Sequence, residues 1–451
     1  MAHSPHVRSC SRRVSYFRSL GRRSGQYKER PGLCLVLLLL RLSVDGTMSD
    51  PVTATSRAYF DHNATTPPDP AVVEAMMRAL ADFGNPSSVH HFGQRAKAVL
   101  DEARSAVAEL IGAEPAEIVF TSGGTESDNF ALRGAADALD ATGRRHLIAS
   151  AIEHEAVLNT LKALQRRGFL ATLLPVDASG VVDPAALESV ITRETAIVSV
   201  MHANNEIGTV QPVAGLAEIA HRHGALFHTD AVQSVAKIPV DVRTLGVDLL
   251  SLSGHKFNGP KGAGALWIKR GTRLVAAMTG GKHERNRRGG TENVPGLAGL
   301  GVAARLARAK MTLEGPRIAA LRDRLERGVL ASVADTAVNG AGSPRVPNTT
   351  NISFEGVEAE SLLIALDLEG FAVSTGSACS SGTLEPSHVL RAMGLPSHRT
   401  QNSIRFSLGA GERGASGRVL VDEVADDLFV ELALEIENVV RDVDGGQALT
   451  L

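Results

Sequence analysis

Cysteine is scarce in this sequence. The 451-residue chain contains three cysteines, and two of them, Cys10 and Cys34, lie within the first 47 residues. Only Cys379 belongs to the rest of the chain, which argues against a framework of disulfides and is typical of a protein from a reducing compartment. One cysteine is also too few to hold an iron–sulfur cluster, and the sequence predicts no metal site.

Aromatic residues, membrane-spanning runs and a strong excess of one charge are missing as well. Aromatic side chains make up 4% of the chain, which argues against a surface that stacks on nucleic-acid bases. The apolar run over residues 32–40 is too short to span a bilayer. The net charge is −2 at pH 7, so neither nucleic acid nor a membrane is predicted as a partner.

The first 47 residues differ from the rest in composition, with nine Lys and Arg against Glu29 and Asp45. Three interpretations remain open: an organelle-targeting segment, a signal peptide without a convincing cleavage site, or upstream sequence translated from a start codon before the true start at Met48. We treat residues 1–56 as a disordered or misassigned extension. We expect a cytoplasmic protein, or one of an organelle matrix if this segment directs targeting.

From Tyr59 onward, short β-rich runs alternate with segments of helical periodicity. The runs cover residues 117–122, 146–150, 196–203, 225–230, 248–253 and 264–269. Near-continuous apolar strands that alternate with helices predict a largely parallel sheet with helices on both faces.

The pattern changes after about residue 315, where a long helix, a strand and a second helix precede the loop that carries Cys379. A chain of this length suits two unequal domains. We therefore predict an α/β fold with four segments: the extension 1–56, a segment 57–66 that joins the small domain, a large domain 67–312 and a smaller α+β domain 313–451 with the cysteine loop.

Polar groups follow several predicted strands, at the edge where ligands of open α/β sheets bind. In TSGGTES, Gly124 allows close backbone approach and Thr125 stands at a helix start, which suits an anion, although a plain helix cap explains the pattern equally. Asp230 ends another strand, with Gln233 one turn on. A carboxylate there either caps a helix or pairs with a protonated pyridine nitrogen.

Lys256 follows an apolar strand in the sequence SGHK. It is poorly placed for a solvated surface residue and well placed for a Schiff base, since partial desolvation and a nearby cation lower the pKa of a lysine. GPKGAG is not a nucleotide loop, because its spacing differs from the phosphate-loop motif and no helix follows. His154, just after a strand, is either a structural hydrogen-bonding residue or a partner of an aromatic cofactor ring.

An anion site, a carboxylate and a lysine together match the requirements of pyridoxal 5′-phosphate (PLP). The phosphate would lie at the helix start, the ring nitrogen on Asp230 and the aldehyde on Lys256. The sequence therefore predicts a PLP-dependent enzyme.

Ten motifs between Tyr59 and about Gly409 resemble those of the group I cysteine desulfurases, the NifS/IscS type of the class V aminotransferase superfamily. They include DHNATTP (61–67), FTSGGTESDN (120–129), SGHKFNGPKG (253–262), HERNRRGGTEN (283–293) and GSACSSGTLEPSHVLRAMG (376–394). The resemblance implies a fold-type I PLP-dependent transferase, with a mostly parallel seven-stranded sheet in the large domain, that acts as a homodimer.

The resemblance also implies a role for each matching residue. Lys256 would hold the cofactor, Asp230 would pair with its ring nitrogen, Gln233 would bind its ring oxygen, and His154 would stack on the ring and carry a proton. Further cofactor contacts would come from Thr125, Gly124, Ser253, His255 and Asn205, and from Thr291, which would reach the phosphate in the partner subunit. The substrate carboxylate would bind Arg405 and Asn205, near Asn85.

On this resemblance, Cys379 is the catalytic thiol, in a polar loop of the kind that carries function and does not pack a core. Its thiolate would attack the sulfur of L-cysteine, release L-alanine and keep the sulfur as a persulfide for an acceptor such as an iron–sulfur scaffold protein. The segment 410–427 is longer and richer in glycine than in the family, so the sequence does not specify the acceptor.

Other functions stay open from the sequence alone. A selenocysteine lyase shares the cofactor residues and needs no such thiol. Another class V PLP enzyme, such as a plain aminotransferase, would release a keto acid in place of alanine and sulfide. A non-catalytic sulfur or iron–sulfur scaffold would use Cys379 as a ligand.

Overall fold

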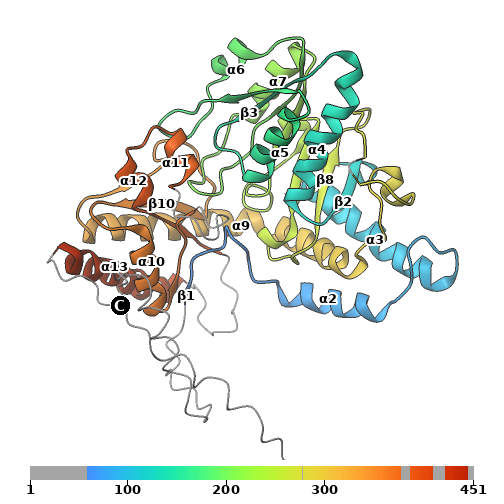
Figure 1. Ribbon diagram of the computed structural model, residues 1–451. Coiled ribbons are helices and arrows are strands. Elements are labelled where there is room, and N and C mark those ends of the chain that lie inside the picture. The colour runs from blue at the N-terminus through green and yellow to red at the C-terminus, as the bar shows by residue number, and fades with distance from the viewer. Residues whose placement is uncertain (1–57, 277, 377–385, 410–421, 445–451) are drawn as a thin grey trace, which may run out of the picture. The chain divides into compact units, whose positions relative to one another are not determined.

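The computed structural model of the protein describes residues 58–276, 278–376, 386–409 and 422–444 (Figure 1). These residues belong to one compact unit that starts at Ser56. The extension 1–56, the loop that carries Cys379 and most of the segment 410–427 lie outside the described residues. None of the helices in the described ranges is long and apolar enough to cross a membrane.

The described part of the chain contains a seven-stranded sheet in the order β2-β8-β7-β6-β5-β3-β4. Its strands are β2 (Ile118–Thr121), β3 (His146–Ser150), β4 (Leu170–Leu174), β5 (Thr195–Ser199), β6 (Leu226–Asp230), β7 (Leu249–Ser253) and β8 (Gly264–Ile268). Only the pairs that involve β8 are antiparallel. The predicted mostly parallel seven-stranded sheet is therefore confirmed.

Helices cover both faces of this sheet, as the apolar strands predict. Along β2, Val119 packs into one apolar cluster, while its neighbours Ile118 and Phe120 pack into another. The cluster around Val119 includes side chains of α4 (Gly124–Leu139) and α5 (Glu155–Gln165), which Figure 1 shows in front of the sheet. The other cluster includes side chains of α3 (His91–Leu110), α7 (Val213–Arg222) and α9 (Val294–Ser332).

Further short elements connect these helices and strands. They are α2 (Pro70–Ala81), the 3₁₀ turn η1 (Pro115–Glu117), η2 (Asp140–Thr142), α6 (Pro184–Val190), α8 (Val242–Leu245), η3 (Gly254–Lys256) and η4 (His283–Asn286). A buried bidentate pair fixes η4, because Arg104 of α3 contacts both carboxylate oxygens of Glu284 at 2.7 Å. The motif HERNRRGGTEN is thereby attached to α3.

The C-terminal part has a separate apolar core and a three-stranded antiparallel sheet in the order β12-β10-β9. The strands are β9 (Thr336–Val338), β10 (Thr349–Phe354) and β12 (Ser403–Ser407), and the helices are α10 (Ala359–Leu368), α11 (His388–Ala392), α12 (Ser397–Gln401) and α13 (Asp422–Asp444). The long helix α9 contributes to both apolar cores. The domain boundary expected at 312/313 falls inside this continuous helix.

The segment after the extension joins the C-terminal part through β1 (Ala58–Tyr59), which pairs in parallel with β11 (Phe371–Ala372). Two residues after β1, Asp61 forms an isolated β-bridge with Ser407 of β12. The motif 61–67 therefore begins beside β12 and continues to η3, where Thr66 N donates to His255 O at 2.8 Å.

Candidate active site

Asp230 and Lys256 lie at the ends of two directly paired strands. Asp230 is the last residue of β6, and Lys256 is the last residue of η3, which follows β7. Because β6 and β7 are parallel, their carboxyl ends share one edge of the sheet. Burial raises the pKa of Asp230 above its usual value, while the charges of His154 and Lys256 act in the opposite direction. A buried carboxylate here suits a cationic partner such as a protonated ring nitrogen.

An anion cradle lies beside these two residues, where β2 leads into α4. Gly123 has φ +149°, a conformation that side chains disfavour, and a Cβ atom there would lie 3.4 Å from the Ser253 hydroxyl. Gly124 and Thr125 form the first turn of α4, and Thr125 is exposed. The helix start therefore offers N–H groups and two hydroxyls to an anion.

The motif 61–67 covers the other side of Lys256. The Lys256 ammonium donates to the carbonyl oxygens of Asn63 at 2.5 Å and Ala64 at 2.9 Å. His255 Nδ1 lies 3.2 Å from the Thr65 hydroxyl. Burial lowers the pKa of His255 to about 4, so its ring is neutral at pH 7.

Asn63 connects most of the site and was not among the predicted site residues. Its side-chain N–H group donates to Asn205 O at 3.0 Å and to the Thr349 hydroxyl at 2.8 Å. The side-chain oxygen of Asn63 accepts from the Lys237 ammonium at 2.8 Å. The backbone oxygen of Asn63 accepts from the Gln233 amide at 3.0 Å. The predicted residues Gln233 and Asn205 are thus brought together through this asparagine.

Arg405, which the sequence predicts to bind the substrate carboxylate, lies on β12 with its guanidinium buried beside Asn205. It donates to Asn205 O at 3.0 Å and to the carboxylate of Asp61 at 2.6 Å. Its Nε atom is buried without a hydrogen-bond partner among the described residues. A guanidinium with unused donor capacity suits a carboxylate ligand. Burial raises the pKa of Asp61, and Arg405 opposes that shift.

Of the two roles that the sequence left open for His154, the structure shows the structural one, and contact with a cofactor ring stays a prediction. His154 caps α5, because its Nδ1 accepts from Ala156 N at 3.1 Å. Burial lowers its pKa, although Asp230 acts in the opposite direction. The ring is therefore neutral at pH 7, and with Nδ1 as the acceptor, the hydrogen lies on Nε2.

For three predicted site residues, the described part of the chain shows no contact with the site around Lys256 and Asp230. Thr291 is exposed, and Asn85 is exposed in the loop between α2 and α3, where its side chain accepts from Ser87 N at 2.9 Å. No hydrogen bond within the described ranges joins either residue to Lys256 or Asp230. Cys379 lies outside the described residues.

Glu153, next to His154, is a further buried carboxyl that the sequence did not single out. It is 0% exposed, and its Oε1 accepts from Ser150 and from Met201 N, while Oε2 has no partner among the described residues. Burial raises its pKa to about 8. Glu153 is therefore protonated at neutral pH in the folded protein and ionised in the unfolded chain.

This difference predicts a loss of stability as the pH rises. An unfolded glutamate loses its proton near pH 4–5, so the folded state is favoured below that range and disfavoured progressively up to about pH 8. We expect Glu153→Gln to raise the free energy of unfolding by about 2 kcal/mol at pH 9 and to change it little at pH 4. Thermal unfolding at both pH values measures the effect, with the exposed neighbour changed in Glu155→Gln as control. An equal change at both pH values would contradict this explanation.

The donor set of the site fits PLP. The cradle of Gly123, Thr125 and Ser253 matches a phosphate group, the Asp230 carboxylate matches a ring nitrogen, and the Lys256 amine matches an aldehyde. No group of three or more His, Cys, Asp or Glu in the described part of the chain could hold a metal ion.

Comparisons with known proteins agree with this chemistry. The family model for aminotransferase class-V matches residues 58–413. Cysteine desulfurase IscS of Dictyoglomus turgidum is 52% identical over 352 residues, which cover 78% of this chain and 89% of the relative. Cysteine desulfurase IscS of Methanosarcina thermophila is 49% identical over 358 residues, which cover 79% of this chain and 88% of the relative.

Solved structures of NifS-like proteins also resemble this chain in fold. A NifS-like protein superimposes with a TM-score of 0.76 and 36% identity, covering 85% of this chain and 99% of its own. SspA in complex with cysteine superimposes with a TM-score of 0.69 and 36% identity, covering 78% of this chain and 98% of its own. The chain therefore belongs to the class V aminotransferase family, in the branch that contains the cysteine desulfurases.

Proposed function

We propose that this protein is a PLP-dependent cysteine desulfurase that converts L-cysteine to L-alanine and keeps the sulfur as a persulfide on Cys379. The observation that carries the proposal is that Lys256 and Asp230 lie at the same edge of the sheet, following two paired parallel strands. The anion cradle at the start of α4 lies beside them. Each part of PLP has a chemically matched group at this edge of the sheet.

The residues of the chain supply binding and proton transfer. When bound, PLP withdraws electrons from the substrate and so allows the carbon–sulfur bond to break. Lys256 holds the cofactor, and Arg405 with Asn205 binds the substrate carboxylate. His154 would carry a hydrogen on Nε2 and could donate it to the bound substrate, since its Nδ1 accepts from Ala156 N.

The thiol of Cys379 accepts the sulfur. As thiolate it attacks the substrate sulfur, so that a sulfur–sulfur bond forms and the carbon–sulfur bond breaks, and its proton is retained in the products. Overall, L-cysteine and the Cys379 thiol give L-alanine and the Cys379 persulfide, without an external oxidant or reductant. A sulfur-acceptor protein, such as an iron–sulfur scaffold, then takes the sulfur, and we place this reaction in the cytoplasm or in an organelle matrix.

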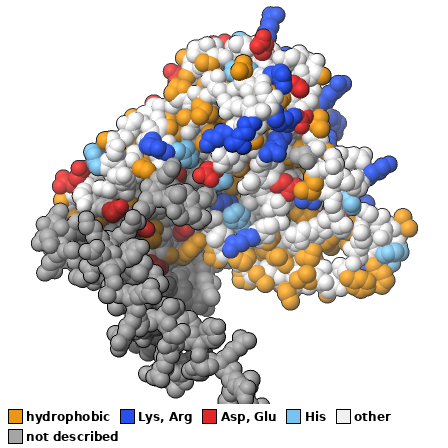
Figure 2. Space-filling model, in the orientation of Figure 1, with side chains coloured by type: hydrophobic (Ala, Val, Ile, Leu, Met, Phe, Trp, Pro, Cys, Tyr) orange, Lys and Arg blue, Asp and Glu red, His pale blue; other side chains and the backbone are white. Residues whose placement is uncertain are grey.

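We also propose that the active enzyme is a homodimer. Exposed apolar side chains gather on α2, on the start of α3 and on the loop between them: Val73, Met77, Leu80, Phe83, Val89 and Phe92. Figure 2 shows an apolar region along the edge of the molecule where Figure 1 places these two helices. An exposed patch of this kind suits a second copy of the chain. Thr291, which is exposed, would then reach the phosphate in the partner's site.

Mass spectrometry after incubation with L-cysteine tests the function. We expect one added sulfur atom on the peptide that contains Cys379, removed by a thiol reductant, together with free L-alanine. The variant Cys379→Ser should lose both products. Retained turnover of L-cysteine in this variant would contradict the mechanism, turnover of selenocysteine alone would indicate a selenocysteine lyase, and release of a keto acid would indicate an aminotransferase.

A further inference from the structure

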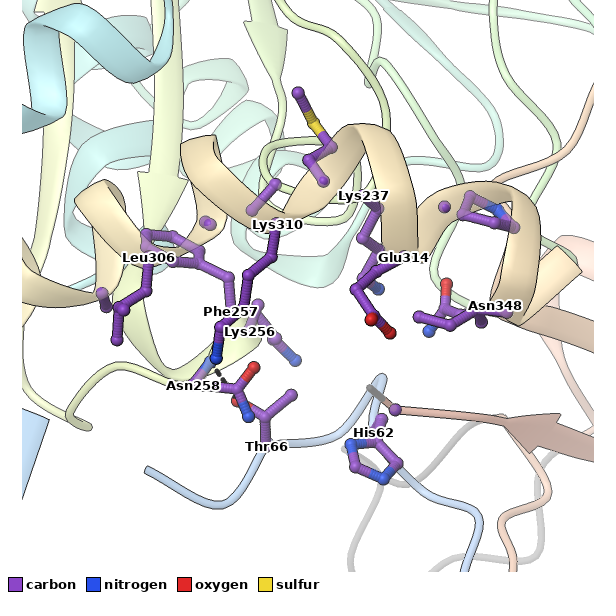
Figure 3. A pocket seen from close by; sticks show the side chains of 18 of the residues that line it. His62, Thr66, Lys237, Lys256, Phe257, Asn258, Leu306, Lys310, Glu314 and Asn348 are labelled. Carbon is purple, nitrogen blue, oxygen red and sulfur yellow. Dashed lines mark hydrogen bonds between the residues drawn. The ribbon is translucent and has the colours of Figure 1, made fainter. Parts of the chain in front are cut away.

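Lys237 is a second lysine at the site, and nothing in the proposed reaction uses it. It lies after β6, and its ammonium donates to the Asn63 side-chain oxygen at 2.8 Å and to Gln233 Oε1 at 2.5 Å. Its side chain also lines a cavity of about 110 Å³ together with Lys256, as Figure 3 shows. Lys237 thus contacts two residues that surround the expected position of the cofactor.

The charge of Lys237 is not neutralised by a carboxylate. Within the described ranges Lys237 makes no ion pair, and its ammonium donates to two neutral amide oxygens, those of Asn63 and Gln233. The titratable or charged groups that face it or share its cavity are His62, Asp69, Lys256, Lys310, Glu314 and Arg405. The two acidic members are already paired, Glu314 with Arg317 at 2.7 Å and Asp69 with Lys310 at 3.5 Å.

Placing Lys237 here therefore costs free energy. Burial and the charges of Lys256 and Arg405 lower its pKa well below the usual range. An ammonium group next to two other cations, without a counter-ion of its own, is stabilised by a negative group that binds beside it. The cofactor fits this requirement, because PLP carries a negative ring oxygen as well as its phosphate.

Lys237 also determines which way the Gln233 amide points. An ammonium group only donates hydrogen bonds, so the atom of Gln233 that faces Lys237 must be the carbonyl oxygen. The amide N–H₂ group then faces the opposite way, where one hydrogen goes to Asn63 O at 3.0 Å. Charge on the carbonyl side polarises the amide and strengthens its N–H groups as donors.

We propose that Lys237 is a positioning residue of the cofactor site, which turns the Gln233 N–H₂ group toward the ring oxygen of PLP and places a positive charge beside Lys256. The inference rests on the proposed function, because it assumes that PLP binds at Lys256. Lys237 is then the nearby cation that lowers the pKa of a Schiff-base lysine. Its charge and the oriented amide both favour a negative ring oxygen and disfavour a proton on the Lys256 nitrogen.

A pH titration of the visible absorption band of bound PLP tests the proposal. In Lys237→Met, which keeps the length of the side chain and removes its charge, we expect the midpoint to rise by about 1 pH unit. In Lys237→Arg, which keeps the charge and for which the cavity offers room, the midpoint should stay close to that of the wild type. Lys310→Met removes another cation of the same cavity and should leave the midpoint unchanged.

The outcomes separate this inference from the proposed function. A wild-type protein that shows no visible band after incubation with PLP would overturn the proposed function itself. If the wild type shows the band and Lys237→Met has the same pH midpoint, the proposed role of Lys237 is overturned. A merely structural residue would change the melting temperature and leave the pH midpoint of the band unchanged. If Lys237→Met does not fold, Lys237→Gln, which keeps a donor and removes the charge, should show the same upward shift, and an unchanged midpoint would overturn the proposal.

Discussion

Replacement of Lys256 by alanine is expected to abolish the visible absorption band of bound PLP and to lower the turnover of L-cysteine by at least about 1000-fold. Lys256 ends η3, just after β7, and β7 pairs with the strand that ends in Asp230, so its amine is the group placed to bond to the aldehyde. The variant also loses hydrogen bonds to the carbonyls of Asn63 and Ala64, at about 1 kcal/mol each. We therefore expect a folded protein that has lost the attachment of its cofactor.

Reduction with borohydride locates the bond directly, since it fixes PLP on the lysine that holds it. Peptide mass spectrometry should find the label on Lys256 in the wild type and none in Lys256→Ala. Lys261→Ala, which changes an exposed lysine of the same motif, should retain the band. A label on Lys237 in the wild type would contradict the assignment, because this second lysine also lines the cavity beside the site.

The sequence predicted the parts of the site that depend on local order along the chain. Asp230, Ser253 and Lys256 each stand at or just after the end of an apolar strand, and strand ends of a parallel sheet meet at one edge. Their convergence therefore follows from the fold class. The same argument gave the helix start at Gly124, although sequence alone could not distinguish a ligand site from a plain cap.

The sequence did not predict the long-range contacts of the site. Lys237 meets Asn63 across 174 positions of the chain, and Arg405 meets Asp61 across 344. Polar side chains have no periodicity that would show such pairings. The available signal was the motif DHNATTP, whose sequence alone gives its residues no role. The structure shows that Asn63 connects residues for which we propose cofactor and substrate contacts, since it bonds to Gln233 and Asn205.

Two features of the fold were also hidden in the sequence. Strand β4 was not among the predicted strands, because it lies at the edge of the sheet and exposes Leu170 and Leu173, which hides the usual burial signal. The continuity of α9 was hidden by Gly315 and Pro316, residues that normally interrupt helices. Tertiary packing against both apolar cores outweighs that local preference.

Replacement of Arg405 by lysine is expected to lower kcat/KM for L-cysteine by about 100-fold, mainly through KM. The guanidinium is 2% exposed and fixed between Asn205 O and Asp61, with Nε buried and without a partner among the described residues. Lysine keeps the positive charge beside Asp61, so the variant avoids a buried unpaired carboxylate. It loses the planar pair of donors that a carboxylate binds at two points.

A comparison of two ligands that differ only in the carboxylate isolates this contact. We expect Arg405→Lys to weaken binding of L-alanine, followed by the change in the PLP spectrum, and to leave binding of ethylamine unchanged. Asp61→Asn serves as the control, because it keeps the guanidinium and disturbs only its orientation, so its effect on L-alanine should be smaller. Equal weakening of both ligands in Arg405→Lys would show that the arginine shapes the site without binding the carboxylate, since only a direct contact discriminates between ligands with and without that group.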